Sequence, residues 1–176
     1  IGTSWNYSRF TESQYDKWLS NINILEFYGI KADVLITLTE DLINTSPRDF
    51  LDIISKWNKN VIRRIKFEQC IDCDLTKDHY GKVDNWLCEL YSMKDIIPLN
   101  IHIFEKGFKW HFNCDNAYTI TPDAIVHKGC PNGLYFNNAV PTNCLTCSIS
   151  DKCRPCRLQR YCTRPKKLME LIEREE

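Results

Sequence analysis

The first 69 residues of this 176-residue chain contain no cysteine, although the whole chain has ten. Small secreted scaffolds that depend on disulfide bonds usually spread their cysteines over the whole chain, so this distribution argues against that class. All ten cysteines therefore lie after residue 69, and seven of them lie between residues 114 and 162. The clustering favours metal binding over disulfide bonds.

The chain also lacks an excess of charge and a long apolar run. Lys and Arg together number 23, as do Asp and Glu, so net charge gives no support for long-range attraction to nucleic acid. No stretch approaches the roughly 18 apolar residues of a transmembrane helix. We therefore expect a soluble, cytoplasmic protein that does not bind membranes and is not primarily a nucleic-acid binder.

The N-terminal part of the chain has the alternating pattern of an α/β fold. Strands are predicted at residues 1–6, 33–39 and 61–68, and the middle one is apolar enough to be covered on both faces. Helices are predicted between them, one beginning at Thr11 with a capping-box pattern and one at Ser46. This order predicts βαβ units and a parallel sheet. Three strands are too few for such a sheet, so we expect further strands to precede the first residue.

Two cysteines follow the third predicted strand in a polar loop. Cys70 and Cys73 form a C-x2-C pair at the carboxyl end of that strand, where α/β folds place ligands. The pair is either half of a metal site or two ordinary loop thiols. Cys88 lies at the edge of the apolar face of the next predicted helix, which favours a small core residue over a ligand.

The pattern of predicted secondary structure changes near residue 95, where short extended segments replace long helices. We therefore predict two domains, residues 1–94 and residues 95–176. In the second, residues 118–121 and 125–127 flank a proline-initiated turn and predict a β-hairpin. Counting outward from the turn brings Cys114 and Cys130 close together, an arrangement that suits a shared metal or a disulfide bond.

A dense run of cysteines follows the hairpin. Five cysteines between residues 144 and 162 are separated by three, six, three and six positions. Such groups bind either tetrahedral zinc or iron–sulfur clusters. The seven cysteines between residues 114 and 162 are an awkward number for closed zinc sites, which take four ligands each, and no histidine lies between residues 130 and 162 to complete them. They suit two four-iron clusters better. Basic residues surround the last cysteines. We interpret them as offsetting the negative charge of a cluster and not as contacts to RNA.

This cysteine order resembles the SPASM domain of radical SAM enzymes, a family with two auxiliary [4Fe-4S] clusters on a seven-cysteine pattern. Upstream, the segments TSWN, DVLITLT and IKFE resemble the second half of a radical SAM partial barrel. The resemblance covers nearly the whole chain. It implies half of a partial parallel (β/α) barrel followed by a small cysteine-rich α+β domain.

The resemblance also implies roles for particular residues. Cys144, Cys147, Cys153 and Cys162 would hold the outer cluster. Cys114, Cys130 and Cys156 would hold the inner cluster. The residues expected to face the cofactor and substrate are Ser4, Asn6, Thr37 and Glu68. The chain departs from the family pattern in the spacing from Cys153 to Cys156, which is one residue shorter, and at Ala124, where a turn glycine is expected.

The sequence contains no C-x3-C-x2-C triplet, the loop whose cluster reduces S-adenosylmethionine in that family. The resemblance therefore implies the C-terminal part of an enzyme, inactive alone, whose auxiliary clusters relay electrons or position a substrate. A peptide or protein substrate and a reductant protein are the implied partners. The alternative is a non-catalytic zinc module that contacts protein or RNA.

Overall fold

The computed structural model describes residues 1–8, 10–70, 76–105 and 164–175. It also describes the backbone of four short strands further along the chain. These are β5 (Trp110–His111), β6 (Tyr118–Ile120), β7 (Val126–Lys128) and β8 (Cys153–Arg154).

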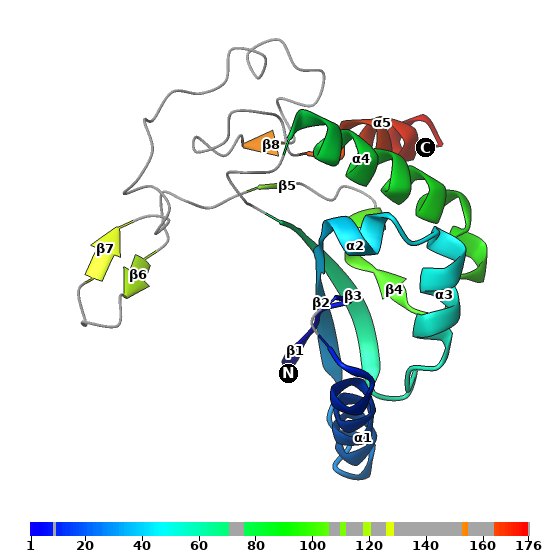
Figure 1. Cartoon of the computed structure of the whole chain (residues 1–176), viewed down its shortest axis with the longest axis vertical. Helices are drawn as coiled ribbons and strands as arrows, with labels where there is room; N and C mark the ends of the chain where they lie inside the picture. Colours follow the sequence, from blue (N-terminus) through cyan, green and yellow to red (C-terminus); the bar gives the residue numbers. More distant parts are fainter. Residues whose placement is uncertain are drawn as a thin grey trace.

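The centre of the fold is a four-stranded parallel sheet (Figure 1). Its strands lie in the order in which they occur in the chain: β1 (Gly2–Trp5), β2 (Ala32–Leu38), β3 (Ile62–Gln69) and β4 (Asn100–Ile101). The three predicted strands and their parallel pairing are confirmed, as is the α/β class. The fourth strand lies within the short extended segments expected after residue 95, but its pairing with β3 was not predicted.

Helices connect the strands as the sequence predicts. The described α-helices are α1 (Glu12–Phe27), α2 (Glu40–Ile43), α3 (Pro47–Ser55), α4 (Lys77–Ser92) and α5 (Lys166–Arg174). Two short 3-10 helices, η1 (Lys94–Ile96) and η2 (His102–Phe104), flank β4. None of the helices in the described part of the chain is both long and apolar enough to cross a membrane.

The predicted helix starts are confirmed by their hydrogen bonds. At the start of α1 the Gln14 amide donates to the Thr11 hydroxyl at 3.3 Å, and the Thr11 amide donates to the Gln14 side chain at 2.9 Å. At the start of α3 the Asp49 amide donates to the Ser46 hydroxyl at 3.1 Å. The chain turns after α1 at Gly29, whose φ of 65° lies in the left-handed region.

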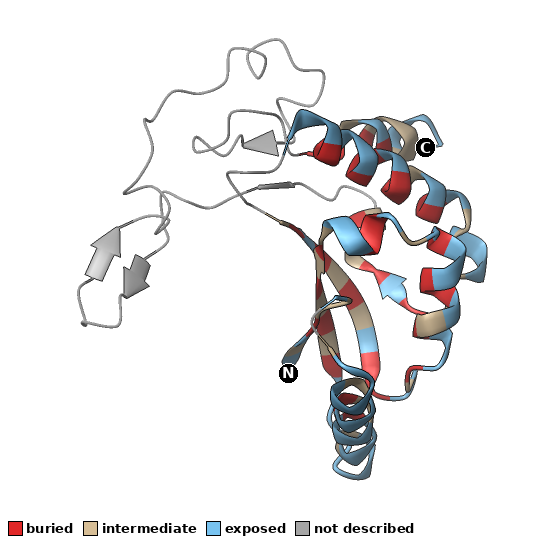
Figure 2. Cartoon of the chain, viewed as in Figure 1, coloured by how far each residue is buried: buried red, intermediate tan, exposed pale blue. Residues whose placement is uncertain are grey.

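One face of the sheet is buried beneath the helices, largely through aromatic side chains. Trp5 of β1 contacts Trp57, with ring centroids 5.2 Å apart, and Phe50 of α3 contacts Trp86 of α4 at 5.3 Å. Phe67 of β3 packs edge-on against Trp86 at 5.8 Å. Figure 2 shows buried positions along the strands and on α3 and α4. These contacts fix the sheet and its helices as one hydrophobic core.

The opposite face of the sheet is polar and only partly covered. Along β2, buried residues alternate with the half-buried Asp33, Leu35 and Thr37. The prediction that this strand is covered on both faces is therefore wrong for the structure described here. The period-two alternation indicates one apolar face and one face that takes polar side chains.

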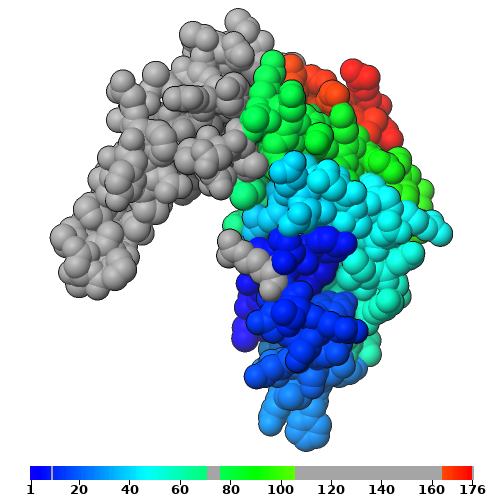
Figure 3. All heavy atoms as spheres, viewed as in Figure 1, coloured from blue at the N-terminus to red at the C-terminus, as the bar shows by residue number. Residues whose placement is uncertain are grey.

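The chain returns to this core at its C-terminus, where α5 lies against α4 (Figure 3). Asp84 of α4 accepts hydrogen bonds from the amides of Lys167 at 2.8 Å and Leu168 at 3.0 Å. The carboxylate thus caps the first turn of α5 from a neighbouring helix. Leu168 is 1% exposed, so α5 is docked on the core.

Replacement of Asp84 by Ala should detach the start of α5, because two amides lose their acceptor in a buried position. We expect the free energy of unfolding to fall by about 1 to 3 kcal/mol, measured by urea denaturation. The matched control is Asn85→Ala, which removes an exposed acceptor for the Lys167 ammonium group. That control should cost less than about 0.5 kcal/mol. Equal losses in the two variants would contradict the capping role of Asp84.

Candidate functional site

The polar face of the sheet carries the residues predicted to face a cofactor. Thr37 and Glu68 are register partners on β2 and β3, so their side chains lie side by side near the carboxyl ends of these strands. Ser4 of β1 pairs with Leu35, which precedes Thr37 by two residues on β2. Ser4 is therefore on the same face but further from the carboxyl ends of the strands. Asn6 follows the end of β1, where its side chain accepts hydrogen bonds from the Ser8 amide and hydroxyl. The structure thus brings Ser4, Thr37 and Glu68 to one face of the sheet and places Asn6 in the loop that follows β1.

An ion-pair cluster occupies the other end of the same face. Asp33 lies 3.1 Å from Arg63, 2.8 Å from Arg64 and 3.2 Å from Lys66. The Asp33 side chain is 12% exposed, whereas that of Arg63 is 59% exposed. Hydrogen bonds from Arg64, together with those from Arg63 and Lys66, hold the pKa of Asp33 well below its usual range. One carboxylate faced by three cations leaves this end of the sheet with surplus positive charge.

The cysteines are distributed differently. Six of the seven predicted ligands, and Cys73, lie outside the described residues, as does Ala124. The exception is Cys153, whose backbone is described in β8. Within the described ranges no group of three or more His, Cys, Asp or Glu side chains is arranged to hold a metal. The predicted ligand sets therefore remain predictions.

The short strands give the backbone framework of the cysteine-rich part. β5 pairs with β8 in parallel, with Trp110 opposite Cys153 and His111 opposite Arg154. β6 and β7 pair antiparallel, which confirms the predicted hairpin. The last described pair of that hairpin is Tyr118 with Lys128. The predicted approach of Cys114 to Cys130 lies outside the described residues.

The segment that follows the cysteine run is held by a contact that the sequence does not predict. Arg164, two positions after Cys162, is 5% exposed. Its guanidinium group donates a hydrogen bond of 3.4 Å to the Gln69 side chain at the end of β3. The two residues are 95 positions apart in the chain, so local patterns could not have revealed their contact.

In the described part of the chain, three basic residues that follow the cysteine run contact the protein itself. Besides the buried Arg164, the Lys166 ammonium group lies 3.9 Å from Glu170, and that of Lys167 lies 2.8 Å from Asn85. These contacts reduce the cationic surface available to a nucleic-acid phosphate backbone.

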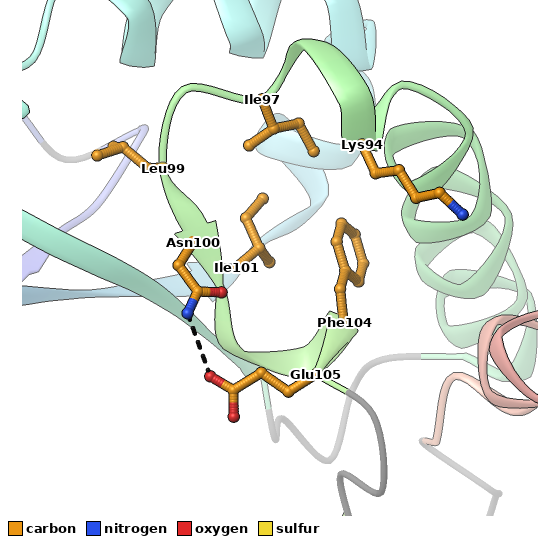
Figure 4. Close-up of a pocket in the computed structure, with 7 residues that line it drawn as sticks. All are labelled: Lys94, Ile97, Leu99, Asn100, Ile101, Phe104 and Glu105. Atoms are coloured by element: carbon orange, nitrogen blue, oxygen red, sulfur yellow. Dashed lines mark hydrogen bonds between the residues drawn. The ribbon is translucent and has the colours of Figure 1, made fainter. Parts of the chain in front are cut away.

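A hollow of about 210 Å³ lies beside β4, lined mostly by apolar side chains (Figure 4). Ile97, Leu99, Ile101 and Phe104 form much of its wall, and the Asn100 amide donates to Glu105 at 3.4 Å at its rim. None of the predicted site residues lines it. It is thus separate from the polar face at Thr37 and Glu68.

Comparison with models of protein families, with curated proteins and with solved structures gives no match to this chain.

Replacement of Asp33 by Asn should destabilise the fold, because three cations lose their shared carboxylate. We expect a loss of about 1 to 2 kcal/mol at pH 7 by urea denaturation, since the partners are partly exposed. The folded-state pKa of Asp33 is depressed, so its contribution is present above the unfolded pKa of about 4 and is lost as the pH falls toward the folded-state value.

The difference between wild type and Asp33→Asn should therefore shrink below about pH 4. The exposed carboxylate of Asp52 on α3 provides the control, and Asp52→Asn should change the stability little at either pH. A wild-type advantage over Asp33→Asn that is the same at pH 7 and pH 2.5 would contradict this account.

Proposed function

We propose that this chain is the C-terminal portion of a radical SAM enzyme of the SPASM type. It would bind auxiliary [4Fe-4S] clusters that relay electrons or position a substrate during modification of a peptide or protein. Its two predicted parts would be the second half of a partial (β/α) barrel, residues 1–94, and a cluster domain, residues 95–176. The triplet that binds the SAM-cleaving cluster is not in this sequence.

The observation that carries the proposal is the parallel pairing of β5 with β8. Trp110 lies opposite Cys153, one of the seven predicted ligands, so the segment that precedes Cys114 in the sequence is joined to the cysteine run. This pairing supports a site to which both segments contribute ligands, as the family resemblance implies.

The donor set also fits an iron–sulfur centre. Cysteine thiolates are the usual ligands of [4Fe-4S] clusters, and this part of the chain supplies seven of them. Cys144, Cys147, Cys153 and Cys162 would hold one cluster, and Cys114, Cys130 and Cys156 the other, whose fourth position would be open to substrate or solvent. When bound, such clusters supply one-electron transfer. The buried Arg164 places a cation two positions from the last of these ligands.

The polar face of the sheet supports the second half of the proposal. Thr37 and Glu68 stand side by side at the carboxyl ends of parallel strands, where α/β folds bind ligands. The Thr37 hydroxyl can donate and accept hydrogen bonds, and the Glu68 carboxylate can accept them. Together they can bind the hydroxyl groups of a ribose or an amino group. Ser4 extends this polar strip to β1, and Asn6 follows at the end of that strand. We assign the strip to S-adenosylmethionine or substrate in the complete enzyme, with an external protein as reductant.

The proposal predicts about eight iron atoms per chain after anaerobic reconstitution with iron and sulfide, because two four-iron clusters are bound. The combined replacement of Cys114 and Cys156 by Ser should remove about half of the iron, since both residues serve one cluster. Iron analysis and the brown absorbance of the clusters measure this directly.

The control is Cys88→Ser, which alters a free thiol on α4 whose pKa is raised to about 11 by burial. It should leave the iron content unchanged. Colourless protein that holds stoichiometric zinc in place of iron would refute the proposal and favour the zinc module.

A further inference from the structure

The polar face of the sheet carries opposite charges at its two ends. Along β3, Arg64, Lys66 and Glu68 alternate with buried residues and therefore lie on this face. Arg64 and Glu68 are four positions apart, so their Cα atoms are about 13 Å apart on an extended strand. The two cations lie toward the amino ends of the strands, and Glu68 lies toward the carboxyl ends. A ligand on this face therefore meets positive charge at one end and negative charge at the other.

Less polar side chains lie between these two ends. The register pairs Leu35 of β2 with Lys66 on one side and with Ser4 of β1 on the other. Leu35 is half-buried and Ser4 is exposed. Binding sites commonly combine apolar surface with a few polar groups that orient the ligand. This row therefore suits a ligand that has aliphatic groups as well as hydrogen-bonding groups.

The cationic cluster, which consists of Arg63, Arg64 and Lys66, is held in place by Asp33. Arg64 donates to Asp33 through Nε at 2.9 Å, and its Nη2 atom lies 2.8 Å from the same carboxylate. Among the described residues its Nη1 atom has no recorded contact, and the Lys66 ammonium group has three donors of which one suffices for Asp33 at 3.2 Å. The cluster is thus ordered and still has hydrogen-bond donors for an anion.

Positive charge remains in the cationic cluster after the neighbouring carboxylates are counted. The pKa of Arg64 is raised mainly by its hydrogen bond with Asp33 and also by the charge of Glu105. Glu105 is itself engaged by His102, whose Nδ1 atom lies 3.0 Å from its carboxylate. Three cations therefore face two carboxylates, and the surplus charge attracts an acidic group.

We propose that this polar face binds a short extended peptide segment with an acidic side chain, whose carboxylate contacts Arg64 and Lys66. An extended peptide advances at about the same distance per residue as the strands beneath it. The acidic residue would then lie two to four positions from the peptide residue beside Thr37 and Glu68. This inference rests on the proposed function, since it names the class of peptide that the same face takes as substrate.

The charge arrangement favours a peptide over a nucleic acid. A nucleic-acid backbone repeats its negative charge at every nucleotide. Glu68 would repel the phosphates that extend beyond the cationic cluster. A peptide can place one carboxylate at the cluster and an amino group or a neutral residue beside Glu68.

The test uses the full chain after anaerobic reconstitution with iron and sulfide, with the iron content measured on the same sample. The probes are two alanine-based hexapeptides with a free amino terminus and an uncharged fluorophore at the carboxyl end. One has glutamate at its fourth position and the other has glutamine. Fluorescence anisotropy at low salt should show that wild type binds the glutamate peptide about fivefold more tightly. The preference should shrink as salt is added, because the cations are partly exposed.

Two substitutions of Lys66 test the contact itself. Lys66→Gln should remove most of the preference for the glutamate peptide, while Asp33 keeps both of its arginine partners. The matched control is Lys17→Gln, which changes an exposed lysine on α1 and should bind both peptides as wild type does. Lys66→Glu should instead prefer a third hexapeptide with lysine at the fourth position. Unfolding would not produce such a reversal, so this variant separates a lost contact from a lost fold.

Equal affinities of wild type for the glutamate and glutamine peptides would overturn the proposal, whatever the iron content. The same preference in wild type and Lys66→Gln would also overturn it. Tighter binding of a short single-stranded RNA at the same face, seen as displacement of the glutamate peptide, would overturn it in favour of a nucleic acid. A glutamate preference that depends on Lys66 in a protein without iron would support the acidic-peptide site while refuting the radical SAM assignment.

Discussion

The return of the chain to its own core depends on the carboxylate of Asp84. Its two oxygens accept hydrogen bonds from the first turn of α5, and Leu168 of that helix is fully covered beside it. Burial raises the pKa of Asp84, while the two amide donors oppose that shift. Together with the contact between Arg164 and Gln69, this cap fixes the segment that follows the cysteine run. The chain thus leaves the sheet after Glu105 and comes back to it at Arg164.

This return has a consequence for the proposed function. The carboxyl edge of β3 ends at Gln69, which is bonded to Arg164, and the polar strip at Thr37 and Glu68 ends at the same edge. A centre held partly by Cys162 would therefore be tethered to the edge where α/β folds bind their ligands. In the proposed enzyme, that tether would link an auxiliary cluster to the substrate-binding face.

Much of the fold could be predicted because its determinants are local. The capping box at Thr11, the cap at Ser46 and the apolar run of β2 each act within a few residues. The uneven covering of β2 could not be predicted from its apolar residues alone, since Leu35 shares a face with the ion-paired Asp33. The cap from Asp84 and the contact of Arg164 join residues more than 80 positions apart. Their partners are set by tertiary packing, and no spacing rule identifies them.

The same distinction applies to the site. The hairpin at residues 118–128 followed from a local turn signal, whereas the pairing of Trp110 with Cys153 joins two short segments without a sequence pattern of their own.

The central claim is that the cysteine-rich part holds two four-iron clusters, one of them beside the ends of β5 and β8. Anomalous diffraction at the iron absorption edge, from anaerobically reconstituted crystals of the full chain, tests it most directly. The account predicts two iron centres, one of them bonded to the sulfurs of both Cys114 and Cys156. Iron bound to neither residue, or a signal at the zinc edge alone at these cysteines, would contradict it.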